Sequence, residues 1–325
     1  MKKLLVSIAA VAALGSFGSS FADTKWDLPS GYGANTFHVQ NLTQFATDVD
    51  KATAGKLKIT VHPNASLFKA NEIKRAVQSG QTPVGEFILS SASNEAPIFG
   101  LDAIPFLATS YSDAKRLDAV SREVLVKTLA AQGMKLLYTV AWPPQSLYSK
   151  KALTKLADLK STKMRAYNPA TSFIATAVGA QPVTIQLAEL PAALATGGVD
   201  NFLTSTSSGI DSKLHESVKF FYDVNAWLPR NAVVVNQKAF DALDKAGQDA
   251  VLQQAAVAET RGWQNSEKNN ADNLKELANK GMKIDTVIGE VLKKELKPIG
   301  DTMTADWLKL AGAEGKAIID AYNKK

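Results

Sequence analysis

The chain has 325 residues, of which 46% are hydrophobic and 21% charged, and its formal net charge is +6 at pH 7. These values fit a globular protein of one large or two medium domains. The chain has no cysteine, which excludes a disulfide framework, a thiol nucleophile and a thiolate metal site. Its lysines are scattered, so it lacks the basic stripe of a nucleic-acid-binding protein.

The first 22 residues have the three parts of a secretory signal peptide. Lys2 and Lys3 form a basic start, LLVSIAAVAAL is an apolar run too short to span a bilayer, and SFA ends at Ala22 as a cleavage site. We expect export to a bacterial periplasm, cleavage after Ala22 and a mature chain that begins at Asp23. No later apolar run reaches the roughly 18–20 residues that cross a membrane.

Short strand patterns alternate with helix patterns through most of the mature chain. KLKITVH alternates Leu57, Ile59 and Val61 with polar residues, which predicts a strand, and MKLLYTVAW is an apolar run typical of a buried strand. In chain order, we expect strands at 56–62 and 84–91, a helix ending at Gly80, a helix at 113–132, a strand at 134–142, helices at 170–178 and 188–196, and strands at 162–167, 182–187, 199–205, 218–224 and 231–236. This alternation predicts an α/β fold with mainly parallel sheets.

The C-terminal part changes to long helices. From Gln237 to about Lys280 the pattern is almost continuously helical, with Asn236 as the N-cap and Gly281 as the stop. A helix of about 30 residues would extend about 45 Å, long enough to lie across two domains. Two further helices are expected near 288–312 and 314–323.

The chain has no Gly/Ser-rich or Pro-rich linker, so two lobes would have to be joined by strands that pass between them. One candidate crossing is 140–148, where Pro143 and Pro144 stop regular pairing, and another is 223–231, which contains Pro229.

No motif for catalysis or metal binding stands out. His38, His62 and His215 are far apart and lack the spacing of a zinc-protease helix, which favours structural or surface roles. The sequence lacks the G-x-S-x-G nucleophile elbow, the G-x-x-x-x-G-K-[ST] phosphate loop and a complete G-x-G-x-x-G fingerprint. No carboxylate pair stands out for acid–base work. Binding is therefore the default hypothesis, and we expect no cofactor, no metal and no enzymatic activity.

The most informative single residue is Arg165, in the short strand KMR. Its planar guanidinium can pair with both oxygens of a carboxylate, which lysine cannot do. The alternative is a structural ion pair, for instance with Asp158 or Glu189, and the residues alone leave both possibilities open. Trp142, Tyr148 and Trp227 lie near the candidate crossings, where they either line a pocket or belong to the core. The hydroxyls of LSSAS (Leu89 to Ser93) either face a ligand crevice or serve simple turn chemistry.

Four segments in order carry a resemblance to a known family. They are GKLKITVHPNASL, APIFGLDAIPFLATSYSDAKRL, LADLKSTKMRAYNPATSFIATAVGAQPVTIQLAELPAALATGGVDNF, and NAVVVNQKAFDAL followed by the long helix. From Asp23 onward the chain resembles the substrate-binding proteins of tripartite ATP-independent periplasmic (TRAP) transporters, the DctP family. The resemblance implies a two-lobe Venus-flytrap fold, a ligand enclosed between the lobes and a long helix spanning both. We expect lobe 1 to hold 23–143 and about 228–262, and lobe 2 to hold 144–227 and about 263–325.

The resemblance also implies ligand-binding residues. In the family an arginine of the K-[ILM]-R strand pairs with the ligand carboxylate, and here that residue is Arg165. Asn168 matches a position that touches the carboxylate end, Thr204 stands where many relatives have asparagine, and Gln145 where some have a second arginine. The other expected contacts are Tyr32, Phe68, Ser90 and Ser91 of lobe 1, Leu187, and the two tryptophans Trp142 and Trp227.

These expectations describe a periplasmic receptor for a small organic acid, delivered to the membrane subunits of a TRAP transporter. Hydroxy-, oxo- and sugar-acid monocarboxylates come first, because the neutral amide of Gln145 weakens the case for a dicarboxylate or sialic acid. The tryptophans leave aromatic acids open. A sensory protein without a transporter, or an enzyme on a similar scaffold, are the competing classes.

Overall fold

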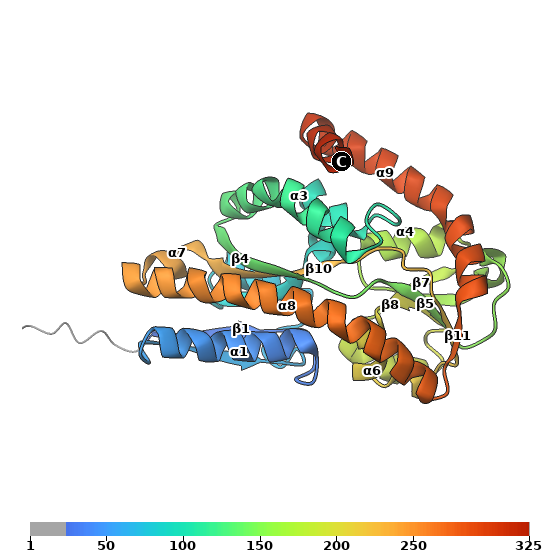
Figure 1. Ribbon diagram of the computed structural model, residues 1–325, viewed down its shortest axis with the longest axis horizontal. Coiled ribbons are helices and arrows are strands. Elements are labelled where there is room, and N and C mark those ends of the chain that lie inside the picture. Colours follow the sequence, from blue (N-terminus) through green and yellow to red (C-terminus); the bar gives the residue numbers. More distant parts are fainter. Residues whose placement is uncertain (1–23, 325) are drawn as a thin grey trace, which may run out of the picture.

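The computed structural model describes residues 24–324, so the predicted signal peptide and its cleavage site lie outside the described residues. Helices and strands alternate as an α/β fold (Figure 1). The strands are β1 (Thr24–Pro29), β2 (Leu57–His62), β3 (Val84–Ile88), β4 (Met134–Ala141), β5 (Ser146–Ser149), β6 (Lys163–Ala166), β7 (Gln181–Thr184), β8 (Asn201–Thr204), β9 (Phe220–Tyr222), β10 (Arg230–Asn236) and β11 (Lys283–Asp285). The α-helices are α1 (Phe37–Ala52), α2 (Ile73–Gln78), α3 (Tyr111–Ala131), α4 (Pro169–Ala177), α5 (Leu190–Ala195), α6 (Thr206–Asp211), α7 (Gln237–Asp241), α8 (Lys245–Asn279) and α9 (Thr286–Asn323). Short 3-10 helices are η1 (Leu89–Ala92), η2 (Pro97–Ala103), η3 (Leu156–Leu159), η4 (Leu187–Glu189) and η5 (Leu214–Glu216).

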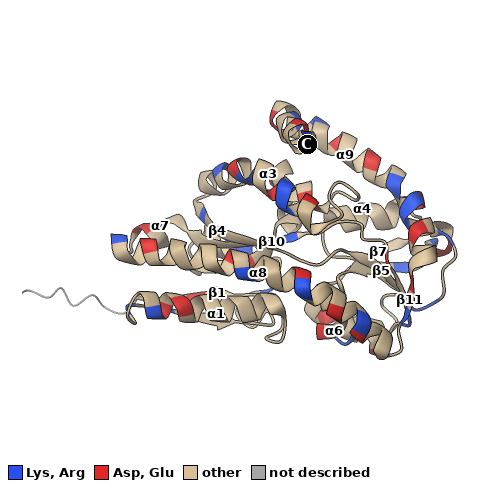
Figure 2. Cartoon of the chain, viewed as in Figure 1, with Lys and Arg blue, Asp and Glu red and all other residues tan. Residues whose placement is uncertain are grey.

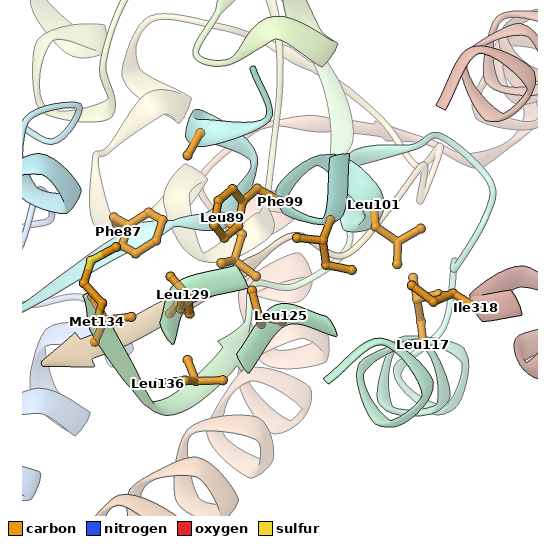
Figure 3. Close-up of a cluster of buried hydrophobic side chains, with 14 of the residues drawn as sticks. Phe87, Leu89, Phe99, Leu101, Leu117, Leu125, Leu129, Met134, Leu136 and Ile318 are labelled. Carbon is orange, nitrogen blue, oxygen red and sulfur yellow. The ribbon is translucent and has the colours of Figure 1, made fainter. Parts of the chain in front are cut away.

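Lobe 1 is the part of the molecule built on two small sheets. β1 pairs in parallel with β2, whereas β10 lies between β3 and β4 and is antiparallel to both. β1 also packs beside β3. A core of apolar side chains lies between the β3-β10-β4 sheet and α3, where Leu125 and Leu129 meet Phe87 and Met134 (Figure 3). These residues recur on one face of each element, and their burial favours the folded state.

Lobe 2 is built on a six-stranded sheet in the order β11-β9-β5-β8-β6-β7. The expectation of mainly parallel sheets is correct for β6 with its neighbours and for β11 with β9, but wrong for β5, which is antiparallel to β8 and β9. It is also wrong for β10 in lobe 1. Both exceptions are strands that enter from the other lobe. No helix connects them to the strand before, so the crossover geometry that makes strands parallel does not apply to them.

Two adjacent segments link the sheets of the two lobes. Residues 142–145 lead from β4 to β5, and residues 223–229 lead from β9 back to β10. They are hydrogen-bonded to each other, with the N–H of Trp142 donating to the carbonyl of Pro229 (2.8 Å) and the N–H of Gln145 to that of Trp227 (2.8 Å). Both predicted crossings are therefore present, while the residue boundaries of the lobes stay a prediction.

The predicted helix at 237–280 is divided. Asn236 caps α7 as expected, accepting from the N–H of Lys238 and Ala239, but α7 ends at Asp241. Asp244 then caps α8, whose 35 residues run to Asn279. A second N-cap thus restarts the helix, and a propensity pattern does not show that break. α8 packs on α1 and β4 of lobe 1 and on α6 of lobe 2, so it spans both lobes (Figure 1).

The last helix also touches both lobes. α9 continues from Thr286 to Asn323 and breaks at Gly312, which has a φ of 59°, close to the predicted gap between two helices. Its first part packs beside β9, whereas Trp307 and Tyr322 belong to the lobe 1 core beside α3. The sequence places these last residues in lobe 2, whereas in the structure they pack on α3. Lys, Arg, Asp and Glu interleave along α8 and α9 (Figure 2), and among residues 24–324 no helix has the length and apolar content to cross a bilayer.

Candidate functional site

A cavity lies between the two lobes and beside the crossing segments. It contains about 630 Å³ of empty space, part of which is open to solvent. Sequence-predicted residues in its wall are Tyr32, Ser91, Trp142, Gln145, Arg165, Leu187 and Thr204. The other lining residues are Gly31, Ala70, Asn71, Glu86, Phe87, Ile88, Tyr167, Gln186, Ser208 and Pro229.

Strand alternation places Arg165 at the cavity. In β6 the side chain of Met164 packs into the lobe 2 core, and Arg165, the next residue, takes the opposite direction. β6 is held between β7 and β8, with Arg165 opposite Val183. The arginine therefore projects from a sheet rather than from a loop, and its backbone position is fixed.

The guanidinium of Arg165 is buried and has no acidic partner. It is 4% exposed, its Nε donates to the carbonyl of Ile185 (2.8 Å), and its Cζ lies 4.8 Å from the ring centroid of Tyr167. Within residues 24–324 no carboxylate forms an ion pair with it. Asp158 and Glu189, the alternative partners, accept backbone N–H groups of Thr154 and Gln186 instead.

Burial shifts the pKa values of three residues in the cavity wall. It lowers the pKa of Arg165 to about 10, so the guanidinium is still charged at neutral pH. Burial also raises the pKa of Tyr32 and Tyr167 well above its ordinary value, which keeps both phenols neutral. A buried cation without a counter-ion is costly, and an anion that enters the cavity would compensate it.

Glu86 is a lining residue that sequence reasoning missed. It lies in the middle of β3, is 2% exposed and is held by three groups. Its Oε2 accepts from the hydroxyl of Ser30 (2.6 Å), and its Oε1 accepts from Nδ2 of Asn231 (3.0 Å) and lies 3.2 Å from Nδ1 of His38. An acidic residue inside the apolar strand VGEFI was the signal that could have identified it, because such residues are rarely buried without a role.

Asn168 and Ser90 join the lobes next to the cavity without lining it. Nδ2 of Asn168 donates to Oγ of Ser90 at 2.7 Å, and both side chains are buried. Oδ1 of Asn168 accepts from the N–H of Thr171, which makes Asn168 the N-cap of α4. One amide thus starts a lobe 2 helix and contacts η1 of lobe 1.

Of the remaining predicted ligand-binding residues, Ser91 lines the cavity, whereas Phe68 and Trp227 do not. Phe68 is half-buried and does not line the cavity, whereas Ala70 and Asn71 of the same loop do. Trp227 is 1% exposed and packs in the lobe 2 core. At the crossing its backbone carbonyl accepts from the N–H of Gln145. Ser91 lines the cavity while its hydroxyl donates to the carbonyl of Ile88 (2.7 Å).

Comparison with known proteins identifies the family. The family model of the bacterial extracellular solute-binding proteins, family 7 (DctP), matches residues 30–310. The chain belongs to this family. The predicted membership, the two-lobe fold and the general function as a solute receptor for organic acids are thereby confirmed.

Three solved structures of this family are closely similar. DctP6 of Bordetella pertussis, an extracytoplasmic solute receptor binding pyroglutamic acid, is 52% identical, with a TM-score of 0.90 over 93% of this chain and 100% of that one. DctP7 of the same organism, which also binds pyroglutamic acid, is 42% identical, with a TM-score of 0.91 over 93% and 100%. A TRAP solute-binding protein from a marine metagenome, specific for pyroglutamate, is 43% identical, with a TM-score of 0.91 over 94% and 100%.

His38 and His62 of this DctP-family chain lie in separate surroundings. Among the residues that the structure describes, no three His, Asp or Glu side chains converge as they would around a metal ion. His38 stays behind the cavity wall, with its ring 4.1 Å from that of Trp142 and 4.2 Å from that of Phe37. His62 instead pairs with Asp27 near the surface.

Proposed function

We propose that this protein is a periplasmic receptor that captures pyroglutamate, or a closely similar cyclic monocarboxylate, between its two lobes. The observation that carries the proposal is Arg165, a buried guanidinium that lines the cavity and forms no ion pair with an acid among residues 24–324. A ligand carboxylate would complete its hydrogen bonds with a matching pair of oxygens.

The charge of the wall favours one carboxylate. Arg165 is the only Lys, Arg or His among the cavity's lining residues within 24–324. Gln145 has a neutral amide, and Glu86 would repel a second carboxylate. A dicarboxylate would therefore bury a negative charge without compensation, which is costly.

The apolar part of the remaining wall suits a small ring. Tyr32, Ile88, Trp142, Leu187 and Pro229 supply aromatic and apolar surface. Such surface can pack against ring methylenes but satisfies few hydroxyls, which favours pyroglutamate over a polyhydroxylated sugar acid. The three similar receptors described above bind pyroglutamate, which supports the same choice.

Capture would proceed by closure of the lobes. The carboxylate docks on Arg165 of lobe 2, and the crossing segments then allow lobe 1 to close over it. Contacts such as Asn168–Ser90, and the hydrogen bond from Nδ2 of Asn35 to the carbonyl of Asp211 (3.1 Å), form between the lobes. The closed form is delivered to the membrane subunits of a TRAP transporter. The protein releases its ligand unchanged and is not an enzyme.

A thermal-shift experiment tests the proposal. We expect pyroglutamate to raise the Tm of the purified mature chain, because a ligand that binds only the folded state stabilises it. Pyroglutamide, in which an amide replaces the carboxylate, should leave the Tm unchanged. Equal shifts for the acid and the amide would remove the role of charge, and recovery of a modified ligand after incubation would favour an enzyme.

A further inference from the structure

Glu86 and Arg165 place opposite charges on the same cavity without contacting each other. Glu86 comes from β3 of lobe 1 and Arg165 from β6 of lobe 2, both side chains are buried, and no ion pair joins them. Glu86 thus belongs to the cavity wall on the side of the lobe opposite the guanidinium. A ligand that fits both must carry an anionic group and, apart from it, a hydrogen-bond donor.

The acceptor capacity of Glu86 is nearly filled. A carboxylate offers about four acceptor positions. Ser30 occupies one on Oε2, while Asn231 and His38 lie against Oε1. One position, on Oε2, has no partner among residues 24–324.

The surroundings fix Glu86 as an acceptor. Oδ1 of Asn231 accepts from Nε1 of Trp142 (2.9 Å) and from the hydroxyl of Tyr32 (3.3 Å), which orients its Nδ2 toward Glu86. Turning that amide over would break all three interactions. Trp142 and Tyr32 also line the cavity, so hydrogen bonds through Asn231 connect the cavity wall to the carboxylate of Glu86.

A single vacant acceptor position selects a particular kind of donor. A primary ammonium group brings three N–H donors and the secondary ammonium of proline brings two, so at least one N–H is left over once the position on Oε2 is filled and needs another acceptor beside Trp142 and Ile88. A lactam N–H brings one donor and no charge. In pyroglutamate the ring nitrogen is bonded to the carbon that bears the carboxylate, so both groups can be engaged together.

We propose that Glu86 accepts the ring N–H of a lactam carboxylate and is the residue that selects lactam acids over lactones and over amino acids. The inference rests on the proposed function, since it requires the carboxylate to sit on Arg165. A lactone would turn a ring oxygen toward Oε2, where two acceptors repel and no hydrogen bond forms.

The test uses the wild-type chain and three ring acids, titrated by calorimetry. The probes are pyroglutamate, its lactone counterpart 5-oxotetrahydrofuran-2-carboxylate, and proline. We expect pyroglutamate to bind at least about tenfold more tightly than either other acid, since a lost hydrogen bond to a charged group has that effect. Equal affinities for pyroglutamate and the lactone would overturn the role of Glu86, and equal affinity for proline would overturn selection against ammonium groups.

A variant adds a second, independent measurement. Glu86→Gln keeps the size of the side chain but offers an amide that can donate, so the ratio of lactam to lactone affinity should fall toward one. The matched control is Glu123→Gln on the exposed face of α3, where Glu123 pairs with Lys127, and this ratio should not change there. An unchanged ratio in Glu86→Gln contradicts the inference. If the wild type binds none of the three acids, the proposed function itself fails, which is a distinguishable result.

Discussion

Asn168 of lobe 2 donates a hydrogen bond to Ser90 of lobe 1 at 2.7 Å, beside the cavity rather than inside it. The same asparagine, three residues after Arg165 along the chain, caps α4. The segment 165–168 thus carries both the guanidinium that faces the cavity and a residue that contacts the other lobe. The contact is available only when the lobes meet, so it should favour the closed form.

Ser90→Ala removes the acceptor of this contact and leaves the α4 cap intact. We expect ligand affinity to fall about three- to tenfold, because Nδ2 of Asn168 becomes unpaired on closure but remains hydrated in the open form. Calorimetry measures the affinity, and Ser112→Ala, at the exposed start of α3, is the control. Unchanged affinity in Ser90→Ala would show that this contact does not assist closure.

Asp118→Asn tests the buried charges behind the crossing segments. Arg230, the first residue of β10, pairs with Asp118 and with Asp102, while Arg122 bridges Asp118 to Glu259 of α8. Although burial acts against it, the two arginines hold the pKa of Asp118 below its ordinary value. Removing its charge leaves Arg230 under-compensated, and we expect a loss of about 3 kcal/mol in the free energy of unfolding. Urea denaturation measures it, and a loss below about 0.5 kcal/mol would mean that the pair is not structural.

Asp211→Asn should stabilise the protein in a pH-dependent way. Burial, with Glu276 nearby, raises the pKa of Asp211 to about 7, and its Oδ2 has no hydrogen-bond partner in the part of the chain that the structure describes. Between about pH 4 and pH 7 the folded state therefore holds a proton that the unfolded chain releases, so this residue lowers stability as the pH rises. The asparagine has no charge to bury.

We expect the Tm of Asp211→Asn to match the wild type near pH 4 and to exceed it near pH 8, as followed by circular dichroism. Partial exposure of the side chain reduces the size of the effect but keeps its sign. Asp272→Asn, at an exposed position of α8, should show no such trend. A Tm difference that is constant with pH, or that grows toward acid, would contradict the assignment.

Periodic patterns in the sequence identified most of the helices and strands. The direction of some strands depends instead on how the two lobes are joined. β4 and β10 are apolar runs that any buried strand would show, but their antiparallel pairing arises because β10 returns from the other lobe. Sequence gives no sign of where a strand returns from. The break between α7 and α8 depends on a cap by Asp244 inside a run of good helix formers, which propensity does not separate.

The candidate site shows the same division. Arg165 could be named because its chemistry is unusual for a buried strand and the family motif surrounds it. Glu86 could not be identified from the sequence, because the residues that hold its carboxylate, Ser30, Asn231 and His38, are distant in sequence and meet only in the fold. Trp227 lies at a crossing, and its ring packs in the lobe 2 core. The local sequence does not show whether an aromatic ring at such a position faces the core or the cavity.

The most direct test of the central claim is a calorimetric titration of Arg165→Lys with pyroglutamate. Lysine keeps the positive charge but loses the planar pair of donors, so we predict at least about tenfold weaker binding, while Arg116→Lys at the surface of α3 should bind as the wild type does. Arg165→Lys with wild-type affinity would contradict the account, because it would show that the buried guanidinium does not hold the ligand's carboxylate.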